Sequence, residues 1–488
     1  MSTPNTHEGA GRISAYLKVC SDNRSTVFFI GVGGVMMSSL ALLTLRNGHP
    51  TVGSDRTRTA VTEELESAGI RVCYGHAEEN LPDNCGLVVY TVAISPDNPE
   101  YTAARRRGIP CVSRADYLGA LMTDYVRRVG VAGMHGKSTC TSICAQILLD
   151  AAVDPTILSG APYGPMGGAY RLGESREHFL FEACEYMDSF LDFNPTVAVL
   201  LGAELEHVDY FKSMEQIIAS FARFAALTGT EGVTVVNADD KNILESARRA
   251  QSRGETGRVI TFSASGRENA DLYARNARTE GGFPCFELVA YGRVRGEVAM
   301  AVPGRFQIIN ALAAAAAMDA FGIPWEAILS GISHYVGAGR RMERRGEVNG
   351  ATVYDDYGHH PTEVKATLEG AKALCAARHE GGRLIVVFQP HTYSRTASLY
   401  QKFLTAFDAA DEVLLLDIYA AREQNDFGVS SRQMAEDING QGAHKARYCP
   451  CVEDAAQAVR SLTREGDCVV IMGAGDVTKV TEALFAGE

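Results

Sequence analysis

A short turn between an apolar run and a helix-like run places the strongest constraint on this chain. The segment GMHGKST at 133–139 follows RVGVA, a buried-strand pattern, and leads directly into CTSICAQIL. In such a unit, backbone N–H groups and the positive helix end can hold phosphates, a lysine can reach the terminal phosphate, and a hydroxyl can bind Mg²⁺. The usual spacing requires glycine at position 131, where Val131 stands, so this loop is a shorter variant. The segment predicts a nucleotide-phosphate site and disfavours a turn that merely caps the helix. The residues predicted to line the site are Gly133, His135, Gly136, Lys137, Ser138 and Thr139.

Length and charge bound the class of protein. The chain has 488 residues, a length typical of about three domains. Its formal net charge of −13 disfavours nucleic acid and anionic membranes as partners. The polar N-terminus lacks the apolar core of a secretion signal, so we expect a cytoplasmic protein whose 12 cysteines are free thiols.

Alternating strand-like and helix-like runs predict three α/β domains in series. We expect a Rossmann-like domain at 1–122, a central P-loop-type α/β domain at 123–338 and a Rossmann-like α/β domain at 339–488. Glycine-separated β-type runs between about 265 and 302 predict a small β insertion in the central domain.

A second glycine cluster follows the first strand-like run. Gly31, Gly33 and Gly34 lie in GVGG, and Asp55 stands where dinucleotide folds place a ribose-binding acid. Because Met36 replaces the third glycine of the usual fingerprint, a tight turn without any ligand stays open as an alternative.

Charged side chains follow several other apolar runs, where the carboxyl ends of parallel strands face a ligand crevice. Those of the central domain are Glu182, Glu204, Glu206, His207 and Asp209, a set that includes metal-binding groups. Those of the third domain lie in DDYGHHPTE at 355–363, QPHTYSR at 389–395 and the pair Arg340-Arg341. These segments predict proton handling or substrate orientation, with a polar helix cap as the alternative for 355–363.

In this order, the motifs GVGG, GMHGKST, FEACE, ELEHVDYF, VPGRFQIINA, GAGRR, DDYGHHPTE, FQPHTYSRT and MGAGD resemble the Mur ligase family. The resemblance covers nearly the whole chain. It implies an ATP-dependent amide-forming enzyme of peptidoglycan synthesis, with roles in cell-wall biogenesis, cell shape and cell division. The DDYGHHPTE string is most similar to members that join L-alanine to the lactyl carboxylate of UDP-N-acetylmuramate through an acyl phosphate.

The same resemblance implies a role for each matching residue. It assigns ATP phosphates and Mg²⁺ to Lys137 and to Ser138 or Thr139, the metal also to Glu182 and His207, and the UDP pyrophosphate to Gly31, Gly33 and Gly34. It places Asn310, Arg341 and Asp356 near the nucleotide. It assigns the amino acid and the substrate carboxylate to His360, His391 and Arg395. His359 or His360 is a candidate for deprotonating the amine. The implied catalytic set is Lys137, Glu182, His207, Arg341 and His360.

Three positions depart from the family pattern: Gly202, Gln307 and Thr392. These departures leave open a catalytically weak nucleotide-binding relative. Two further alternatives are a family member that reattaches recycled tripeptide, which shares most of the motifs, and a pyridine-nucleotide oxidoreductase, suggested by GVGG alone. For the L-alanine ligase we expect a monomer or homodimer.

Overall fold

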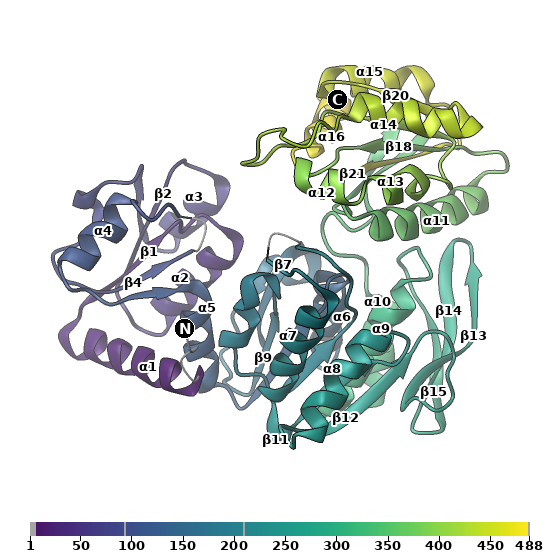
Figure 1. Cartoon of the computed structure of the whole chain (residues 1–488). Helices are drawn as coiled ribbons and strands as arrows, with labels where there is room; N and C mark the ends of the chain where they lie inside the picture. Colours follow the sequence, from purple (N-terminus) through teal and green to yellow (C-terminus); the bar gives the residue numbers. More distant parts are fainter. Residues whose placement is uncertain (1–5, 92–93, 208–209, 487–488) are drawn as a thin grey trace. The chain divides into compact units, whose positions relative to one another are not determined.

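The computed structural model describes residues 6–91, 94–207 and 210–486, with side chains described from residue 11 onward except at Ala443 (Figure 1). The chain divides into two compact units. Unit 1 holds Met1–Thr261 and Ala316–Pro324, and unit 2 holds Phe262–Ala315 and Trp325–Glu488. None of the described helices combines the length and apolar character needed to span a bilayer.

The N-terminal part of unit 1 is a parallel five-stranded sheet. Its elements are β1 (Thr26–Ile30), α2 (Val35–Arg46), β2 (Thr51–Asp55), α3 (Ala60–Ser67), β3 (Arg71–Tyr74), η1 (Glu78–Asn80), β4 (Cys85–Tyr90), α4 (Pro99–Arg106), β5 (Cys111–Ser113), α5 (Arg114–Leu121) and η2 (Met122–Asp124). The strand order is β3-β2-β1-β4-β5. The order therefore reverses between β1 and β4, and their carboxyl ends open the crevice where such sheets bind ligands.

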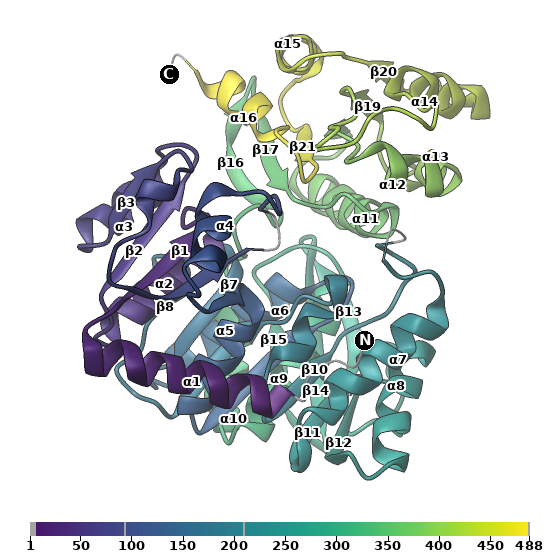
Figure 2. The same ribbon diagram turned by 60° about the vertical axis from the view of Figure 1, so that its left-hand side comes forward.

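Helices cover both faces of this sheet because alternate side chains of a strand point to opposite sides. On β1, Val27 and Phe29 belong to the core shared with α2 and α5, whereas Phe28 and Ile30 belong to a separate core with α4. Helix α1 (Thr6–Asn23) runs along α5 (Figures 1 and 2). No sequence motif predicts this helix. It buries Ile13 against the first of these cores.

The central part of unit 1 is a second sheet whose middle strands are buried on both faces. Its elements are β6 (Arg127–Ala132), α6 (Lys137–Asp150), β7 (Thr156–Tyr163), η3 (Gly164–Met166), β8 (Gly168–Arg171), β9 (His178–Glu182), η4 (Tyr186–Asp192), β10 (Val197–Leu200), α7 (Met214–Ala226), β11 (Gly229–Asn237) and α8 (Lys241–Ser252). In unit 1 the order is β11-β10-β6-β9-β7-β8, and β6 pairs in parallel with β9 and β10. The carboxyl ends of β6, β9 and β10 therefore meet at one edge, beside the β6–α6 turn.

The predicted small β insertion is a meander in unit 2. Its elements, with the strand before it and the helices after it, are β12 (Thr256–Ser263), β13 (Leu272–Glu280), β14 (Phe283–Ala290), β15 (Arg293–Ala299), α9 (Gln307–Ala320) and α10 (Trp325–His334). Strands β13, β14 and β15 are antiparallel, and Gly281 and Gly282, both with positive φ, close the first hairpin.

A third, six-stranded sheet completes unit 2, in the order β16-β17-β21-β18-β19-β20. Its elements are β16 (Glu343–Val348), β17 (Ala351–Asp356), α11 (Pro361–Arg378), β18 (Leu384–Phe388), α12 (Tyr393–Ser398), α13 (Tyr400–Ala406), β19 (Glu412–Leu415), α14 (Ser431–Ile438), η5 (Asn439–Ala443), β20 (Ala446–Tyr448), α15 (Val452–Leu462), β21 (Cys468–Met472) and α16 (Thr478–Phe485). On β18, Val386 faces the core shared with α11 and α13, and Val387 faces that shared with α15 and α16. Three α/β sheets confirm the predicted fold class.

Candidate active site

Two glycines shape the β6–α6 turn. Gly133 has φ 150° and Gly136 has φ 82°, conformations that residues with a Cβ rarely adopt. A Cβ at Gly133 would also lie 2.8 Å from the Cβ of Leu201. Gly136 is the N-cap of α6 and supplies no side-chain cap, so the first N–H groups of the helix point outward uncapped, as an anion site requires.

Lys137 lies across this turn. Its Nζ donates to the carbonyl oxygen of Gly133 at 2.6 Å and to Oε2 of Glu185 at 2.9 Å. Burial alone would lower the pKa of Lys137, but the nearby Glu185 and, more weakly, Glu182 carboxylates outweigh it and raise the pKa. The ammonium is therefore fully charged at neutral pH, as phosphate binding requires.

Glu185 is the residue that sequence reasoning missed. Its side chain is 1% exposed, and its Oε1 lies 3.3 Å from Nε2 of His207. Burial would raise the pKa of Glu185, but Lys137 and His207 lower it. The carboxylate is ionised and shared between two cation-forming groups. The only signal in the sequence was its place in FEACE, three positions beyond the predicted Glu182.

The other predicted acids of the central sheet lie near the same edge in different roles. Glu182 ends β9 and accepts the Gly160 N–H at 3.0 Å. Oε2 of Glu204 lies 3.3 Å from Nε2 of His135 in the phosphate turn. Glu206 is buried, and Asp209 lies outside the described residues.

Serine and threonine hydroxyls complete the turn. Ser138 and Thr139 are both buried in the first turn of α6. They lie directly after Lys137, so the structure places the hydroxyls predicted for a metal next to the ammonium predicted for phosphate.

In the first sheet, the GVGG turn and Asp55 come together. The N–H of Gly33 donates to Oδ2 of Asp55 at 2.8 Å, and the N–H of Arg56 donates to Oδ1 at 2.7 Å. A Cβ at Gly33 would lie 2.8 Å from the same Oδ2, which explains the glycine. Gly34 caps α2 without a side-chain hydrogen bond, so a second uncapped helix N-terminus faces the crevice. Asp55 thus holds the turn, a role that sequence reasoning did not foresee.

A buried carboxylate lies at the same edge. Glu100, which is 0% exposed in its side chain, lies 2.8 Å from Nδ1 of His76. It also accepts from Ser54 Oγ at 2.8 Å and from Asn80 Nδ2 at 2.6 Å. These bonds fix the imidazole of His76 beside the end of β2.

In unit 2, Asp356 and Arg341 lie at the carboxyl end of β17. Asp356 accepts the N–H groups of Met342 at 2.9 Å and Gly358 at 2.7 Å. Burial raises the pKa of Asp356 to about 6, against the opposing charge of Arg341. The Arg341 guanidinium lies over the Tyr357 ring at 5.2 Å, and its buried Nε has no hydrogen-bond partner among the described residues. A buried unsatisfied donor on a cation is a feature of ligand sites.

His360 takes the helix-cap position that the sequence predicted as one of two alternatives. It is fully buried and is the N-cap of α11, with Nδ1 accepting the Thr362 N–H at 3.3 Å. Oε2 of Glu363 accepts the His360 N–H at 3.3 Å in return, so the polar-cap role is present.

His391 and Arg395 form a pair after β18. Nδ1 of His391 lies 3.1 Å from a terminal nitrogen of Arg395, and the His391 ring stacks on Tyr419 at 5.4 Å. Burial, followed by the positive charge of Arg395, lowers the pKa of His391 to about 4. The imidazole is therefore neutral at physiological pH.

The three positions that depart from the family pattern have different local surroundings. Gln307 Oε1 accepts from Asn310 Nδ2 at 3.2 Å, so the glutamine amide keeps its partner oriented. At Gly202, a Cβ would lie 3.4 Å from Asp240 Oδ2, and Asp240 instead accepts the Ala203 N–H at 2.8 Å. Thr392 has φ 65° and precedes α12. Nothing in the structure explains the choice of threonine there.

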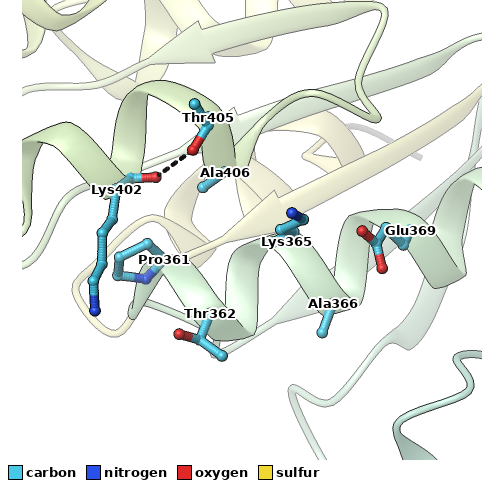
Figure 3. A pocket seen from close by; sticks show the side chains of 8 residues that line it. All are labelled: Pro361, Thr362, Lys365, Ala366, Glu369, Lys402, Thr405 and Ala406. Carbon is cyan, nitrogen blue, oxygen red and sulfur yellow. Dashed lines mark hydrogen bonds between the residues drawn. The ribbon is translucent and has the colours of Figure 1, made fainter. Parts of the chain in front are cut away.

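A groove of about 370 Å³ lies beside the first turns of α11 (Figure 3). Its walls come from α11 and α13, and most of the side chains are exposed. The lining residues are Pro361, Thr362, Lys365, Ala366, Glu369, Lys402, Thr405 and Ala406. None of them is a predicted site residue, although Pro361 directly follows His360.

Family models match three consecutive segments of the chain. They are described as the Mur ligase family catalytic domain at 26–126, the Mur ligase middle domain at 131–318 and the Mur ligase glutamate ligase domain at 340–475. The chain belongs to the Mur ligase family.

Curated relatives extend over nearly the whole length. A UDP-N-acetylmuramate--L-alanine ligase of Clostridium acetobutylicum is 40% identical over 96% of this chain and 98% of its own. One of Acetivibrio thermocellus is 41% identical over 93% of this chain and 94% of its own.

Solved structures share the fold. The crystal structure of a UDP-N-acetylmuramate-alanine ligase from Thermotoga maritima has a TM-score of 0.77 at 23% identity, covering 94% of this chain and 98% of that one. A murein peptide ligase from Psychrobacter arcticus has a TM-score of 0.68 at 22% identity, with the same coverage of 94% and 98%.

Proposed function

We propose that this chain is an ATP-dependent ligase that joins L-alanine to the lactyl carboxylate of UDP-N-acetylmuramate, in peptidoglycan precursor synthesis. Family membership and curated relatives of that activity at about 40% identity support the proposal. The single structural observation that supports it most is the charged Lys137 held by Glu185 in an otherwise uncapped phosphate turn.

The proposed reaction has two steps. The lactyl carboxylate attacks the γ-phosphorus of ATP, the bond to ADP breaks, and an acyl phosphate forms. The amine of L-alanine then attacks the acyl carbon, loses a proton and releases phosphate, which leaves an amide. Because two anions meet in the first step, Lys137 lowers the barrier by neutralising the charge that develops there.

The residues present fit Mg²⁺. We propose that Glu185 and the neighbouring His207 serve the metal, with Glu182 further along the same edge and the hydroxyl of Ser138 or Thr139 as further oxygen donors. The ionised, fully buried Glu185 carboxylate is the group that carries this fit. When bound, the metal would neutralise phosphate oxygens during transfer.

In unit 2, the proposed roles belong to groups already oriented by the fold. Arg341 and Asp356 would act on the nucleotide, and His391 with Arg395 on the amino acid and substrate carboxylate. Because the His391 imidazole is neutral, Arg395 is the charged member of this pair. This favours a role for the pair in binding a substrate anion. The GVGG turn with uncapped α2 would hold the UDP pyrophosphate.

One assay tests the proposal. Phosphate release from ATP should require both UDP-N-acetylmuramate and L-alanine. Lys137→Ala should abolish amide formation in a protein that still folds, with lower stability because the buried Glu185 loses its partner. Lys479→Ala, which removes an exposed lysine paired with Asp476, is the matched control and should keep full activity. Release that ignores both acceptors would identify a bare ATPase, and a preference for the tripeptide over L-alanine would identify a recycling ligase. Near wild-type turnover of Lys137→Ala would overturn the phosphate role.

We also propose a cytoplasmic enzyme that acts as a monomer or homodimer. The carboxylate acceptor and ATP are both soluble, anionic substrates, which fits an acidic chain that binds them only at local cationic sites. Sedimentation equilibrium distinguishes the two oligomeric states.

A further inference from the structure

Two consecutive residues next to Glu185 have an unusual backbone. Met187 and Asp188 have φ 55° and 59°, although neither is glycine. The left-handed region is unfavourable for residues with a Cβ, so a run of two must be held by its surroundings. The N–H of Asp188 donates to the carbonyl oxygen of Glu185 at 2.9 Å, so this turn reverses the chain beside the buried carboxylate.

Among the described residues, polar contacts are made by the Asp188 side chain and not by that of Met187. Oδ2 of Asp188 accepts from Tyr210 Oη at 2.9 Å and from a terminal nitrogen of Arg223 at 3.2 Å. Its Oδ1 accepts from Ser220 Oγ. The side chain of Met187, in contrast, is 50% exposed. The Asp188 carboxylate therefore anchors the turn to α7 and to Tyr210.

The same turn places an aromatic ring on His207. The Tyr186 ring lies 4.8 Å from the His207 ring and 6.5 Å from the Tyr210 ring. The N–H of Tyr210 donates to the carbonyl oxygen of His207 at 2.8 Å. Asp188 is thus connected to His207 in two ways. The turn that it anchors carries the Tyr186 ring, and its carboxylate binds the hydroxyl of Tyr210, whose N–H binds the His207 carbonyl.

We propose that Asp188 is a positioning residue that fixes the imidazole of His207 against Glu185. His207 itself has φ 53°, and Glu185 is its only carboxylate partner among the described ion pairs. With the ring held on one side by Tyr186, its Nε2 lies 3.3 Å from Oε1 of Glu185. Lys137 Nζ donates to the same oxygen at 3.3 Å and, more closely, to Oε2 at 2.9 Å. The inference rests on the proposed function, in which Glu185 and His207 serve the metal.

Glycine substitutions separate the side chain of Asp188 from its backbone. Asp188→Gly removes the carboxylate but readily accepts the left-handed conformation. Met187→Gly makes the same change one position earlier, where the side chain is exposed, and is the matched control. Tyr210→Phe removes only the hydroxyl that bonds Asp188 and serves where Asp188→Gly fails to fold.

Two measurements follow. In ligand-free protein, nitrogen-edited NMR of the histidine rings, with His207 assigned by His207→Gln, should show the His207 signals shifted or broadened by Asp188→Gly and Tyr210→Phe but unchanged by Met187→Gly. The Mg²⁺ concentration for half-maximal turnover should rise about 10- to 100-fold in Asp188→Gly, as for partners of metal ligands, and stay unchanged in Met187→Gly.

The outcomes separate the positioning role of Asp188 from the metal role of His207. Unchanged His207 signals in both Asp188→Gly and Tyr210→Phe would overturn the positioning role. Shifted signals with wild-type Mg²⁺ dependence in His207→Gln would support the positioning role and refute the proposed metal role of His207.

Discussion

One buried ammonium sets the electrostatics of the phosphate turn. The Lys137 side chain is 15% exposed, and its charge is balanced by Glu185. A buried ion pair contributes little net stability, but removing one partner leaves an uncompensated charge and is strongly destabilising. The pair is therefore better understood as a way to keep Lys137 charged and oriented than as a source of stability.

Glu185→Gln should damage both stability and catalysis. The amide keeps the shape but removes the charge facing Lys137, so the free energy of unfolding should fall by about 2–3 kcal/mol. Turnover should fall about 100-fold or more, the loss typical of a charge-stabilising group. Glu245→Gln, which removes the charge of a half-exposed carboxylate paired with Arg249, is the control. Urea unfolding and steady-state turnover measure both effects, and equal losses in Glu185→Gln and Glu245→Gln would contradict the assignment.

The sequence predicted Glu182 for this site but could not predict that Glu185 is the carboxylate in contact with Lys137 and His207. Glu182 ends β9, and residues at the carboxyl ends of parallel strands generally face the ligand. This rule does not apply to residues beyond the end of the strand. Glu185 lies in the irregular turn beyond it, whose direction depends on the left-handed Met187 and Asp188. Such a conformation opposes the intrinsic preference of both residues, so local sequence patterns cannot predict it.

His391 should make stability depend on pH. Its pKa is 6.5 in the unfolded chain and about 4 in the folded protein, so between these values the unfolded chain binds the extra proton. This contribution to stability is present above pH 6.5 and is lost as the pH falls toward 4. Wild type should therefore lose more stability than His391→Gln between pH 7.5 and pH 5. Urea midpoints of both proteins at the two pH values test this, and equal losses would mean that burial does not hold the imidazole neutral.

At the scale of elements, two helices begin in the same way. Both α2 and α6 follow a central parallel strand and start at a glycine without a side-chain cap. Many helices satisfy these N–H groups with a serine, threonine, aspartate or asparagine. Helices α12, α13, α15 and α16 also lack a side-chain cap, but among the described helices with an assigned N-cap only α2 and α6 begin at a glycine, which leaves their N–H groups open to an anion. Patterns of hydrophobicity and glycine predicted both of these strand–turn–helix segments. They did not predict α1, because no motif or turn precedes it.

Gly136→Ala should weaken the phosphate turn as an element. At φ 82° an added Cβ costs about 1–2 kcal/mol of folding free energy, and a shifted turn misaligns the N–H groups of α6. We expect the KM for ATP to rise about tenfold, in line with the sensitivity of catalysis to small displacements. Gly164→Ala, at an exposed position with no atom within 4 Å of the added Cβ, is the control. If the two variants have equal KM values for ATP, the backbone of this turn does not bind the nucleotide.

At the scale of the whole molecule, the proposed roles are divided between the two units. The phosphate turn belongs to unit 1, whereas Arg341, Asp356 and His391 belong to unit 2. Neither unit therefore carries the complete set for the proposed first step. The motifs for ATP and for the amino acid lie in separate predicted α/β segments. Strands β13–β15 pair through β12 with the central sheet and not with the six-stranded sheet, although they are grouped with unit 2.

Arg341→Ala tests whether unit 2 is needed before the amine arrives. With ATP and UDP-N-acetylmuramate but no L-alanine, wild type should form one equivalent of ADP as the acyl phosphate accumulates. The variant should lose this burst about 100-fold in rate, because the guanidinium offsets charge that develops as phosphate transfers. Its dissociation constant for UDP-N-acetylmuramate should stay within about twofold, since the turn proposed to hold the UDP pyrophosphate lies in unit 1 and contains no residue of unit 2. Arg344→Ala, which removes an exposed arginine paired with Glu347, is the matched control. A normal burst in Arg341→Ala would show that unit 1 alone activates the carboxylate and that unit 2 serves only the amide-forming step.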